Sequence, residues 1–597
     1  MPQYTPPLRD MQFVLHELID VTATFREIPA HADVDVDTVN AILEEGGKFA
    51  AQVVFPLNRS GDEEGCTLDK STHEVRTPAG YRAAYAQYVE GGWPSLSCDP
   101  EYGGQGLPHV VNQCFYEMLN SANQAWTMYP GLSHGAYEAL HAHGTPEQKA
   151  TYLPKLTSGE WTGTMCLTEP HCGSDLGLLK TRAVPNGDGS YAITGTKIFI
   201  TAGDHDFTDN IVHLVLARLP DAPAGSKGIS MFIVTKVKVD RDGKLGEPNA
   251  VRCGALEHKM GIHASATCVM NFDGAEGWLI GEPHKGLMAM FTMMNTARLA
   301  VGLQGLGLSD RAYQNALRYA RERLQMRSLT GAKNPDKPAD PILVHPDVRR
   351  MLLTQKALIE GGRLLGYHGA SLVDVVAHDP DAETRKRADA LLGFLTPIVK
   401  ACLTEWAIEC TYHAQQCFGG HGYIHEHGME QLARDARITT LYEGTTGIQA
   451  LDLMGRKVMQ LQGAGLQVFL GMIEEFCAAQ SGNDALGEFV GPLREVAKEW
   501  QALTLQIGKR AMADADEIGA AAWDYLFYSG YAALAYWWAR SVAAADASSQ
   551  PQAFKDAKRE TARFYFARLL PRTRTHAAGI AAGTASLMTL PDAGFGD

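Results

Sequence analysis

Hydrophobic residues recur at helical spacing through the first part of the chain, from about residue 37 to residue 161. In the stretches 37–51 and 112–143 apolar residues return every three or four positions, which predicts helices. Loops rich in Gly and Pro at 101–108 and 144–147 interrupt this pattern. We therefore expect a helical region over residues 37–161, preceded by an N-terminal extension over residues 1–36.

Between residues 162 and 282 the pattern changes to short apolar runs of strand length, separated by Gly, Asp and Asn turns. The runs are Tyr191–Thr201, Ile211–Ala217, Gly228–Val239 and Ala266–Phe272. Several short strands divided by turns are typical of a closed or two-layered antiparallel sheet. This part of the chain is expected to form a compact β-barrel or sandwich domain.

Helical periodicity returns after Gly286, in the stretches 287–324, 347–375, 381–416, 429–440 and 447–461. An Ala-rich region, 466–587, predicts another helical bundle, and residues 329–343 predict a surface loop. The expected fold is mainly α with a central β-barrel domain. The predicted division is an N-terminal extension (1–36), a helical domain (37–161), a β-barrel domain (162–282), a C-terminal helical bundle (283–462) and an additional helical domain (463–597).

Composition narrows the class of protein. The 597 residues are 45% hydrophobic and 20% charged, which suits several domains with large cores. A formal net charge of -15 argues against nucleic acid or an anionic membrane as the main partner. The 11 cysteines include no Cys-x-x-Cys pair, and the N-terminus has no basic segment followed by an apolar one. A cytoplasmic protein without a signal peptide or a membrane span is expected.

The run Leu441–Thr446 places the carboxylate of Glu443 between an aromatic residue and a glycine, directly after a predicted amphipathic stretch. A carboxylate held at the mouth of a pocket suits abstraction of a weakly acidic C–H proton, which needs a positioned base. By itself the run is equally typical of a solvated Glu near a helix end. Its interpretation as a catalytic base depends on three further motifs.

The first motif, Met165–Asp175, lies where the helical region meets the β-region. Its hydroxyls on Thr168 and Ser174, and a loop fixed by Pro170 and Gly173, favour a polar or anionic ligand. An ordinary turn between two domains is the alternative.

The second motif, Gly195–Gly203, places Phe199 and Thr201 on one face of a strand. An aromatic ring beside a hydroxyl can pack on a planar ligand and hydrogen-bond its heteroatom, although Phe199 is equally a candidate core residue. The third motif, Gln416–Tyr423, has three glycines in four residues, which permits close backbone approach to a sugar or phosphate. A helix C-cap would explain only one of them.

These motifs together resemble the acyl-CoA dehydrogenase family over roughly residues 40–455. Further segments that match the family in order are Glu101–Gly106, Gly144–Lys149, Lys259–Gly261 and Arg434–Ala436. With its N-terminal extension and additional C-terminal helical domain, the chain is similar to the large subgroup that contains 3-methylmercaptopropionyl-CoA dehydrogenases and large bacterial fatty-acyl-CoA dehydrogenases. The resemblance implies a flavoprotein oxidoreductase of fatty acid β-oxidation.

The resemblance also implies roles for individual residues. Glu443 would remove the α-proton of an acyl-CoA while the β-hydride passes to N5 of FAD, and the main-chain N–H of the base would help to polarise the thioester carbonyl. In some relatives the base lies on the helix after the barrel, but the matching stretch here, Met293–Arg298, contains no acid.

By the same resemblance, FAD would be held by residues from two subunits, so a homodimer is expected. The implied FAD contacts are Met165, Leu167, Thr168, Ser174, Phe199, Ile200, Thr201, Arg323, Gln325, His345, Gln416, Cys417, Gly419, Gly420 and Thr445. The implied substrate contacts are Ser174, Asn295, Arg298, Tyr442 and Gly444. Met326 and Gly447 depart from the family's usual Phe and Gln.

No metal site is predicted, because His421, His425 and His427 lie in a glycine-rich loop without a carboxylate of clear ligand geometry. In the family, the helix that contains Gly131 and Gly135 would lie near the acyl tail, and the space beside two glycines favours a medium- or long-chain acyl-CoA.

The product would be a trans-2-enoyl-CoA, with the electrons passing to electron-transfer flavoprotein. Three alternatives stay open: a dehydrogenase of short thioether acyl-CoA such as 3-methylmercaptopropionyl-CoA, an acyl-CoA oxidase that reduces oxygen, and a DNA-binding flavoprotein of alkylation stress.

Overall fold

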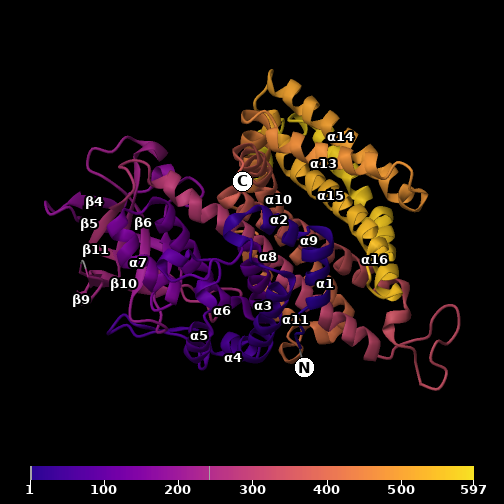
Figure 1. Cartoon of the computed structure of the whole chain (residues 1–597), viewed down its shortest axis with the longest axis horizontal. Helices are drawn as coiled ribbons and strands as arrows, with labels where there is room; N and C mark the ends of the chain where they lie inside the picture. Colours follow the sequence, from indigo (N-terminus) through magenta and orange to yellow (C-terminus); the bar gives the residue numbers. More distant parts are fainter. Residues whose placement is uncertain (1–2, 241, 597) are drawn as a thin grey trace. The chain divides into compact units, whose positions relative to one another are not determined.

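The computed structural model describes residues 3–240 and 242–596, which form two compact units (Figure 1). The barrel unit consists of residues 45–108 and 118–300. The bundle unit consists of the N-terminal residues up to Glu44, residues 109–117 and the chain from Val301 onward. Three of the four boundaries fall inside helices α3 (Val36–Phe49), α6 (His109–His143) and α8 (Gly286–Glu322), and the fourth falls at the start of α6.

The helices of the barrel unit are short, apart from the segments of the long helices α6 and α8 that lie in it. Besides parts of α3, α6 and α8, the unit contains α4 (Leu57–Glu64), α5 (Tyr81–Glu90), α7 (Pro146–Ser158) and the short strands β1 (Thr67–Leu68) and β2 (Val75–Arg76). The start of α7 shows why such helices begin where they do. Thr145 accepts a hydrogen bond from the Gln148 main chain, and the Gln148 side chain accepts one from the Thr145 main chain. This reciprocal cap, with Pro146 after it, satisfies main-chain donors that a helix start leaves open.

The predicted β-barrel is confirmed. Its strands are β3 (Thr162–Cys166), β4 (Arg182–Pro185), β5 (Tyr191–Thr201), β6 (Ile211–Arg218), β7 (Ile229–Thr235), β10 (Val251–Leu256) and β11 (Thr267–Ile280), with β8 (Val237–Val239) and β9 (Leu245–Pro248) as a separate pair. The sheet runs in the order β10-β11-β5-β4-β6-β3, and β7 pairs with both β11 and β6. Strands β11, β5, β4, β6 and β7 therefore form a closed ring, and β10 and β3 stand at the two ends of the strand order.

Strand β6 shows why this region lacks a simple alternating pattern: seven of its eight residues are buried. Val212, Leu214 and Leu216 belong to one apolar cluster with Leu140 of α6 and Leu153 of α7. The two helices therefore cover the face of the sheet to which these side chains point. A strand that is buried on both faces appears in the sequence as a continuous apolar run.

Three long helices dominate the bundle unit: α9 (Pro346–His378), α10 (Ala382–Phe418) and the second half of α8. The shorter helices α11 (Met429–Thr439) and α12 (Thr446–Leu451) follow α10. Helices α9 and α10 pack against each other along their length. A Cβ at Gly302 would lie 2.9 Å from the Val399 carbonyl, and one at Gly305 would lie 2.7 Å from the Leu403 carbonyl. Glycine at both positions therefore lets α8 approach α10 closely.

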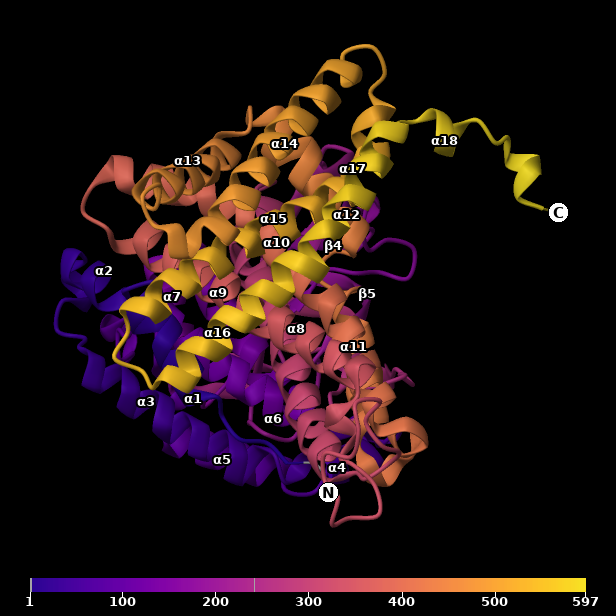
Figure 2. The same cartoon turned by 90° about the vertical axis from the view of Figure 1, so that its right-hand side faces the viewer.

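The additional helical domain also belongs to the bundle unit, where its helices lie side by side (Figures 1 and 2). They are α13 (Ala464–Ala479), α14 (Gly487–Ala511), α15 (Asp516–Ala547), α16 (Gln552–Phe564), α17 (Thr573–Ala582) and α18 (Ala585–Met588). Helix α15 is the central one, and it contacts α9, α10, α14, α16 and α17. Figure 2 shows α18 leading to the C-terminus away from the other helices of this domain.

The N-terminal extension packs against the additional domain, at the opposite end of the sequence. It contains α1 (Leu8–Gln12), a π-helical turn (Phe13–Leu18) and α2 (Val21–Glu27). The ring of Phe13 lies edge-on to Phe554 with centroids 5.1 Å apart, and Arg540 donates to the Leu18 carbonyl at 2.9 Å. The ends of the chain thus stabilise each other within the bundle unit.

A buried network of charges holds the parts of the bundle unit together. The guanidinium of Arg363 on α9 lies 2.7 Å from Glu117 and also pairs with Asp10 of the extension. Lys558 of α16 pairs with the same Asp10 and lies 2.8 Å from Glu360. Burial opposes ionisation of Asp10, but the two cations hold its pKa well below its usual range.

One helix in the described part of the chain, Ala382–Tyr423, is long and apolar enough to cross a membrane. However, 78% of its most apolar window is buried. Helices α9, α11, α13 and α15 all contact it. Its apolar character is therefore explained by its position in the core of the bundle unit.

Candidate active site

The turn between α11 and α12 carries Glu443 in a left-handed backbone conformation, with φ +56°, followed by Gly444 with φ +85°. For a residue with a side chain this conformation costs on the order of 1–2 kcal/mol, so the surrounding contacts must stabilise it. A Cβ on Gly444 would also lie 2.7 Å from the Gln449 side chain. Glycine at 444 is required by conformation and by space.

Three side chains fix this turn, here named the base turn (residues 441–446). Gln449 donates its amide to the Glu443 carbonyl at 2.9 Å, and the Lys400 ammonium donates to the Gly444 carbonyl at 2.8 Å. The Thr446 hydroxyl donates to Glu405 at 2.6 Å. Because Lys400 and Gln449 are fully buried, these bonds form away from competing water.

The neighbours of Glu443 that we predicted to contact substrate and cofactor are also held in place. The Tyr442 hydroxyl donates to Gln304, whose amide in turn donates to the Tyr116 hydroxyl at 2.9 Å. The oxygen of the Thr445 hydroxyl accepts from the Ile448 main chain at 3.3 Å and so caps α12. Tyr442, Glu443, Gly444 and Thr445 therefore form one ordered group in the bundle unit.

A second group of predicted residues gathers at one edge of the barrel, where the end of β3 meets the end of β5. The Ile198 main chain donates to the Thr168 carbonyl at 2.9 Å, which brings the two motifs side by side. Phe199 has φ +60°, and the residue is 59% exposed. Thr201 is half-buried, whereas Ile200 is only 3% exposed, so Ile200 could contact a ligand mainly through its main chain.

The remaining residues of this barrel edge have accessible groups as well. Met165 and Leu167 are partly buried against the apolar cluster of the barrel, and Ser174 is exposed in the following turn. An exposed aromatic ring, hydroxyls and main-chain groups on one edge suit a planar ligand with polar heteroatoms.

Glu169 explains how the first motif keeps its shape. One carboxylate oxygen lies 2.8 Å from the Lys197 ammonium and accepts from the Thr181 hydroxyl, and the other accepts from the Lys180 main chain at 2.7 Å. Burial by itself would raise the pKa of Glu169, but Lys197 and these hydrogen bonds hold it at about 2.

This pair predicts a pH dependence of stability. Its stabilising effect is complete above the ordinary carboxyl pKa near 4.5 and is lost as the pH falls toward about 2, because the folded state must then take up a proton that it disfavours. Lys197→Met leaves Glu169 buried without its cation. At neutral pH we expect the free energy of unfolding of the wild type to be about 3 kcal/mol higher than that of this variant. The difference should shrink as the pH falls and the Glu169 carboxyl is protonated. Urea unfolding of both proteins at several pH values measures it, and a constant difference would contradict it.

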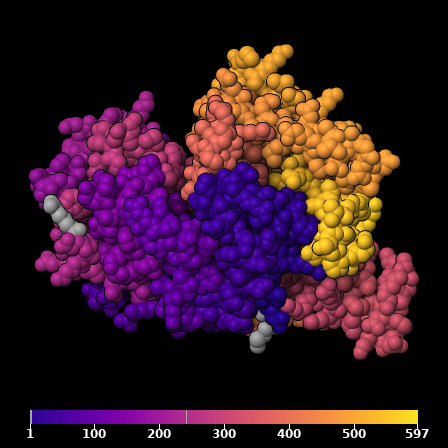
Figure 3. All heavy atoms as spheres, viewed as in Figure 1, coloured from indigo at the N-terminus to yellow at the C-terminus, as the bar shows by residue number. Residues whose placement is uncertain are grey.

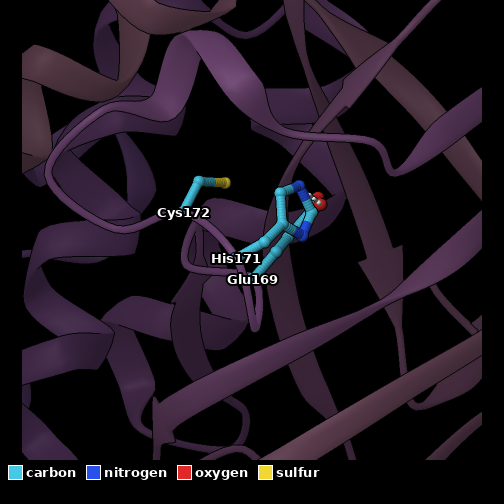
Figure 4. Close-up of side chains that lie close together, drawn as sticks. All are labelled: Glu169, His171 and Cys172. Carbon is cyan, nitrogen blue, oxygen red and sulfur yellow. Dashed lines mark ion pairs between the residues drawn. The ribbon is translucent and has the colours of Figure 1, made fainter.

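Glu169, His171 and Cys172 are the one group in the described ranges whose ligand atoms lie close enough to hold a metal ion, within 4.8 Å of one another (Figure 4). The Glu169 carboxylate is already bonded to Lys197. His171 Nε2 lies 3.0 Å from the Leu178 carbonyl, to which it can only donate. A metal would have to displace the buried ammonium, so the contacts favour a structural role for this group.

The glycine-rich motif follows the end of α10. Gly419, with φ +58°, and Gly420 are both exposed, and a Cβ on either would meet no atom within 4 Å. Gln416 is exposed, whereas Cys417 lies in the core of the bundle unit, so its thiol faces away from any ligand at the surface. The open backbone at these glycines would admit a sugar or phosphate group.

The loop between α8 and α9 brings together the three predicted contacts that lie in it. An isolated bridge joins Leu324 to Pro341, and His345 Nε2 donates to the Gln325 carbonyl at 2.9 Å. Arg323 and Gln325 are exposed. The loop projects from the helices of the bundle unit (Figure 3), which would let these side chains reach a second molecule.

Comparisons with known protein families cover nearly the whole chain. The family profiles "Acyl-CoA dehydrogenase, N-terminal domain", "middle domain" and "C-terminal domain" match residues 37–160, 164–275 and 284–459. A further profile, "Acetyl-CoA dehydrogenase C-terminal like", matches residues 469–591. The chain belongs to the acyl-CoA dehydrogenase family.

Relatives with curated functions agree with this assignment. The 3-methylmercaptopropionyl-CoA dehydrogenase of Ruegeria pomeroyi is 47% identical over 470 residues, which cover 79% of each chain. The broad-specificity linear acyl-CoA dehydrogenase FadE5 of Mycobacterium tuberculosis is 38% identical over 496 residues, 81% of this chain and 80% of that one. A solved acyl-CoA dehydrogenase of Bacillus anthracis in complex with FAD has the same fold, with a TM-score of 0.75, 20% identity and coverage of 94% and 90%.

Two of the residues predicted to contact the substrate, Asn295 and Arg298, lie on the first half of α8, in the barrel unit. Asn295 is exposed, and Arg298 is only 5% exposed. The predicted residues thus form two groups. In the barrel unit they lie at the barrel edge and on the first half of α8. In the bundle unit they lie in the base turn, in the glycine-rich motif after α10 and in the loop between α8 and α9. Their roles in binding and catalysis remain predictions.

Sequence analysis missed residues that support the candidate site. Lys400 and Gln449 fix the base turn. A signal for Lys400 was present, because it is a single cation within the apolar run 395–403 of a helix. The space beside Gly135 was also misjudged, because a Cβ there would lie 2.9 Å from the side chain of Met293, which fills it. No periodicity in the sequence could have revealed that contact.

Proposed function

We propose that this chain catalyses FAD-dependent α,β-dehydrogenation of an acyl-CoA to the trans-2-enoyl-CoA, with Glu443 as the base. The observation that carries the proposal is the conformation of Glu443. A left-handed backbone at a residue with a side chain, fixed by two fully buried side chains, is typical of a site where position matters more than stability.

The residues of the barrel edge fit the flavin of FAD, which supplies the acceptor for the β-hydride when it is bound. The exposed ring of Phe199 offers an apolar face, and Thr201 and Thr168 offer a hydroxyl beside it. In the proposed assignment the open backbone at Gly419 and Gly420 accepts a polar part of FAD from a neighbouring subunit. Arg323 supplies positive charge for the same purpose.

The proton transfer falls to the base turn. The Glu443 carboxylate takes a proton from the carbon next to the thioester, and the turn holds that carboxylate so that little reorganisation is needed. The main-chain N–H of Glu443 is proposed to donate to the thioester carbonyl, which makes the α-proton more acidic. The buried amide of Gln449 and the ammonium of Lys400 fix the carbonyls that follow.

We propose a short acyl tail as the first candidate. Helix α6 was expected to leave space at Gly131 and Gly135, but Met293 of α8 occupies the space beside Gly135 and is 1% exposed. The relative that acts on 3-methylmercaptopropionyl-CoA supports a short tail with a thioether. A medium- or long-chain acyl-CoA is the second candidate, supported by the broad-specificity linear enzyme and by the flexibility of methionine.

Met293→Ala tests whether the Met293 side chain limits the length of the acyl tail. Shortening this side chain would open the space beside Gly135. We expect kcat/KM for octanoyl-CoA, divided by kcat/KM for butyryl-CoA, to rise by roughly 10-fold, because each extra methylene that finds a pocket contributes about 1 kcal/mol or more. Met288→Ala, a change at a 60% exposed position on the same helix, should leave the ratio unchanged. An unchanged ratio in Met293→Ala would place the acyl tail elsewhere.

The proposed electron acceptor is electron-transfer flavoprotein, and the proposed assembly is a homodimer in the cytoplasm. All 11 cysteines are free thiols, which suits a reducing compartment. The net charge of -15 disfavours DNA as a partner. If oxygen reoxidised the reduced flavin and hydrogen peroxide formed at the same rate, an acyl-CoA oxidase would be favoured instead.

The test of the proposed function is anaerobic titration of the purified flavoprotein with acyl-CoAs. The substrates are butyryl-, 3-methylmercaptopropionyl-, octanoyl- and palmitoyl-CoA, and the visible absorbance of the flavin is followed. Loss of absorbance with enoyl-CoA as product supports dehydrogenation, and the tail that reduces the flavin fastest identifies the substrate class. No bleaching with any of the four would overturn the proposal.

A further inference from the structure

Lys400 is a fully buried cation in the middle of helix α10. Its neighbours along the helix, Ile398, Val399, Cys402 and Leu403, are all buried and apolar. Removing an ammonium group from water costs several kcal/mol unless hydrogen bonds and opposite charge compensate for it. A lysine at such a position therefore indicates that its charge or its hydrogen-bond donors are needed there, which an apolar residue of similar length would not supply.

The ammonium of Lys400 reaches the turn that contains the proposed base. Its nitrogen lies 2.8 Å from the carbonyl of Gly444, the residue directly after Glu443. A hydrogen bond from a charged donor is roughly twice as strong as one between neutral groups. Gln449 supplies only a neutral amide, which lies 2.9 Å from the Glu443 carbonyl and 3.4 Å from that of Gly444.

The same helix holds the turn at a second point. Glu405, five residues after Lys400, accepts from the Thr446 hydroxyl at 2.6 Å. Helix α10 thus contacts the base turn on both sides of Thr445. The two contacts restrain a turn that has two consecutive residues with positive φ.

We propose that Lys400 is the positioning residue of the active site: through the Gly444 carbonyl it holds the base turn in the conformation from which Glu443 reaches the α-proton. The inference rests on the proposed function of Glu443. Lys400 acts through the main chain. Its loss should therefore misplace the base, while the proposed acyl-CoA and FAD contacts outside the base turn stay in place.

The variant Lys400→Met keeps the length of the side chain and removes the charge and the donors. Lys386→Met is the matched control, because Lys386 lies on the same helix with its side chain 79% exposed. Two quantities are measured on the FAD-bound proteins. Stopped-flow reduction at increasing acyl-CoA concentration gives the limiting rate and the apparent Kd, and hydrogen–deuterium exchange reports the main chain of residues 441–446.

For Lys400→Met we expect the limiting rate of flavin reduction to fall by roughly 100-fold, the effect of misplacing a catalytic group by about 1 Å. The apparent Kd should stay within about 3-fold of wild type, since Ser174, Asn295 and Arg298, the proposed substrate contacts outside the base turn, are unchanged. Exchange of residues 441–446 should be at least about tenfold faster than in wild type, as expected when a local structure opens more often. Lys386→Met should match wild type in all three quantities.

A limiting rate within about 3-fold of wild type, or unchanged exchange in residues 441–446, would overturn the proposal. If Lys400→Met does not fold with FAD, Lys400→Gln is measured instead. It keeps a neutral donor and should show a smaller loss of rate with faster exchange, whereas wild-type values would overturn the proposal. If no acyl-CoA bleaches the wild type, the proposed function fails, and the exchange measurement still decides whether Lys400 holds the turn.

Discussion

Glu443→Gln is expected to lower the rate of flavin reduction by acyl-CoA by about 10³–10⁴-fold, because the amide cannot accept the α-proton. The substitution keeps the size of the side chain and the main-chain bonds of the base turn, so FAD content and the apparent Kd of acyl-CoA should change little. Anaerobic stopped-flow absorbance with the best substrate of the titration measures the rate, and the visible spectrum of the resting protein measures FAD content.

Glu426→Gln serves as the control, because Glu426 is an exposed carboxylate in the same unit. Its rate of reduction should equal that of the wild type. Retention of most of the activity in Glu443→Gln would move the base to another residue. Loss of FAD together with activity would show that the position serves the cofactor site instead.

Arg363→Met is expected to give the largest loss of stability, about 3–5 kcal/mol in the free energy of unfolding of the bundle unit. The guanidinium is buried with Glu117, which is also fully buried, and with Asp310 and Asp10. Removing it leaves these carboxylates in the interior without their shared cation. Urea unfolding followed by circular dichroism measures the change in midpoint and slope.

The control for this prediction is Arg387→Met on α10. Arg387 is 59% exposed and lies 4.0 Å from Glu475, so the loss of this surface pair should cost less than about 1 kcal/mol. A change of similar size in both variants would show that the buried network contributes no more than a surface contact. A stabilised Arg363→Met would show that burial of the charges costs more than their attraction returns.

Much of the fold could be predicted from the sequence, because local signals determine it. Short apolar runs between turn residues predicted the β-barrel, and long stretches with helical spacing predicted α8, α9 and α10. The sequence did not predict that the N-terminal extension packs against the additional domain. The contact of Phe13 with Phe554 joins opposite ends of the chain, and periodicity within either segment contains no information about the other.

The candidate site divides in the same way. Glu443 stood out because a motif of consecutive residues contains it, with Gly444 directly after it. Lys400 did not, because its partner carbonyl is 44 residues away and a lone lysine in an apolar helix has several explanations. Met293 beside Gly135 was hidden for the same reason, since packing between helices depends on three-dimensional proximity.

The cover of helix α10 has a consequence for the synthesis of the protein. Residues of α15, such as Leu526 and Tyr531, pack on Cys402 and Trp406 of α10, but they leave the ribosome more than a hundred residues later. At about 5–20 residues per second, a helix apolar enough to resemble a membrane span waits for roughly ten seconds without its partner. We therefore expect the part of α10 that α15 covers to be exposed to aggregation during that interval, and to stay exposed in a chain that ends at Leu461.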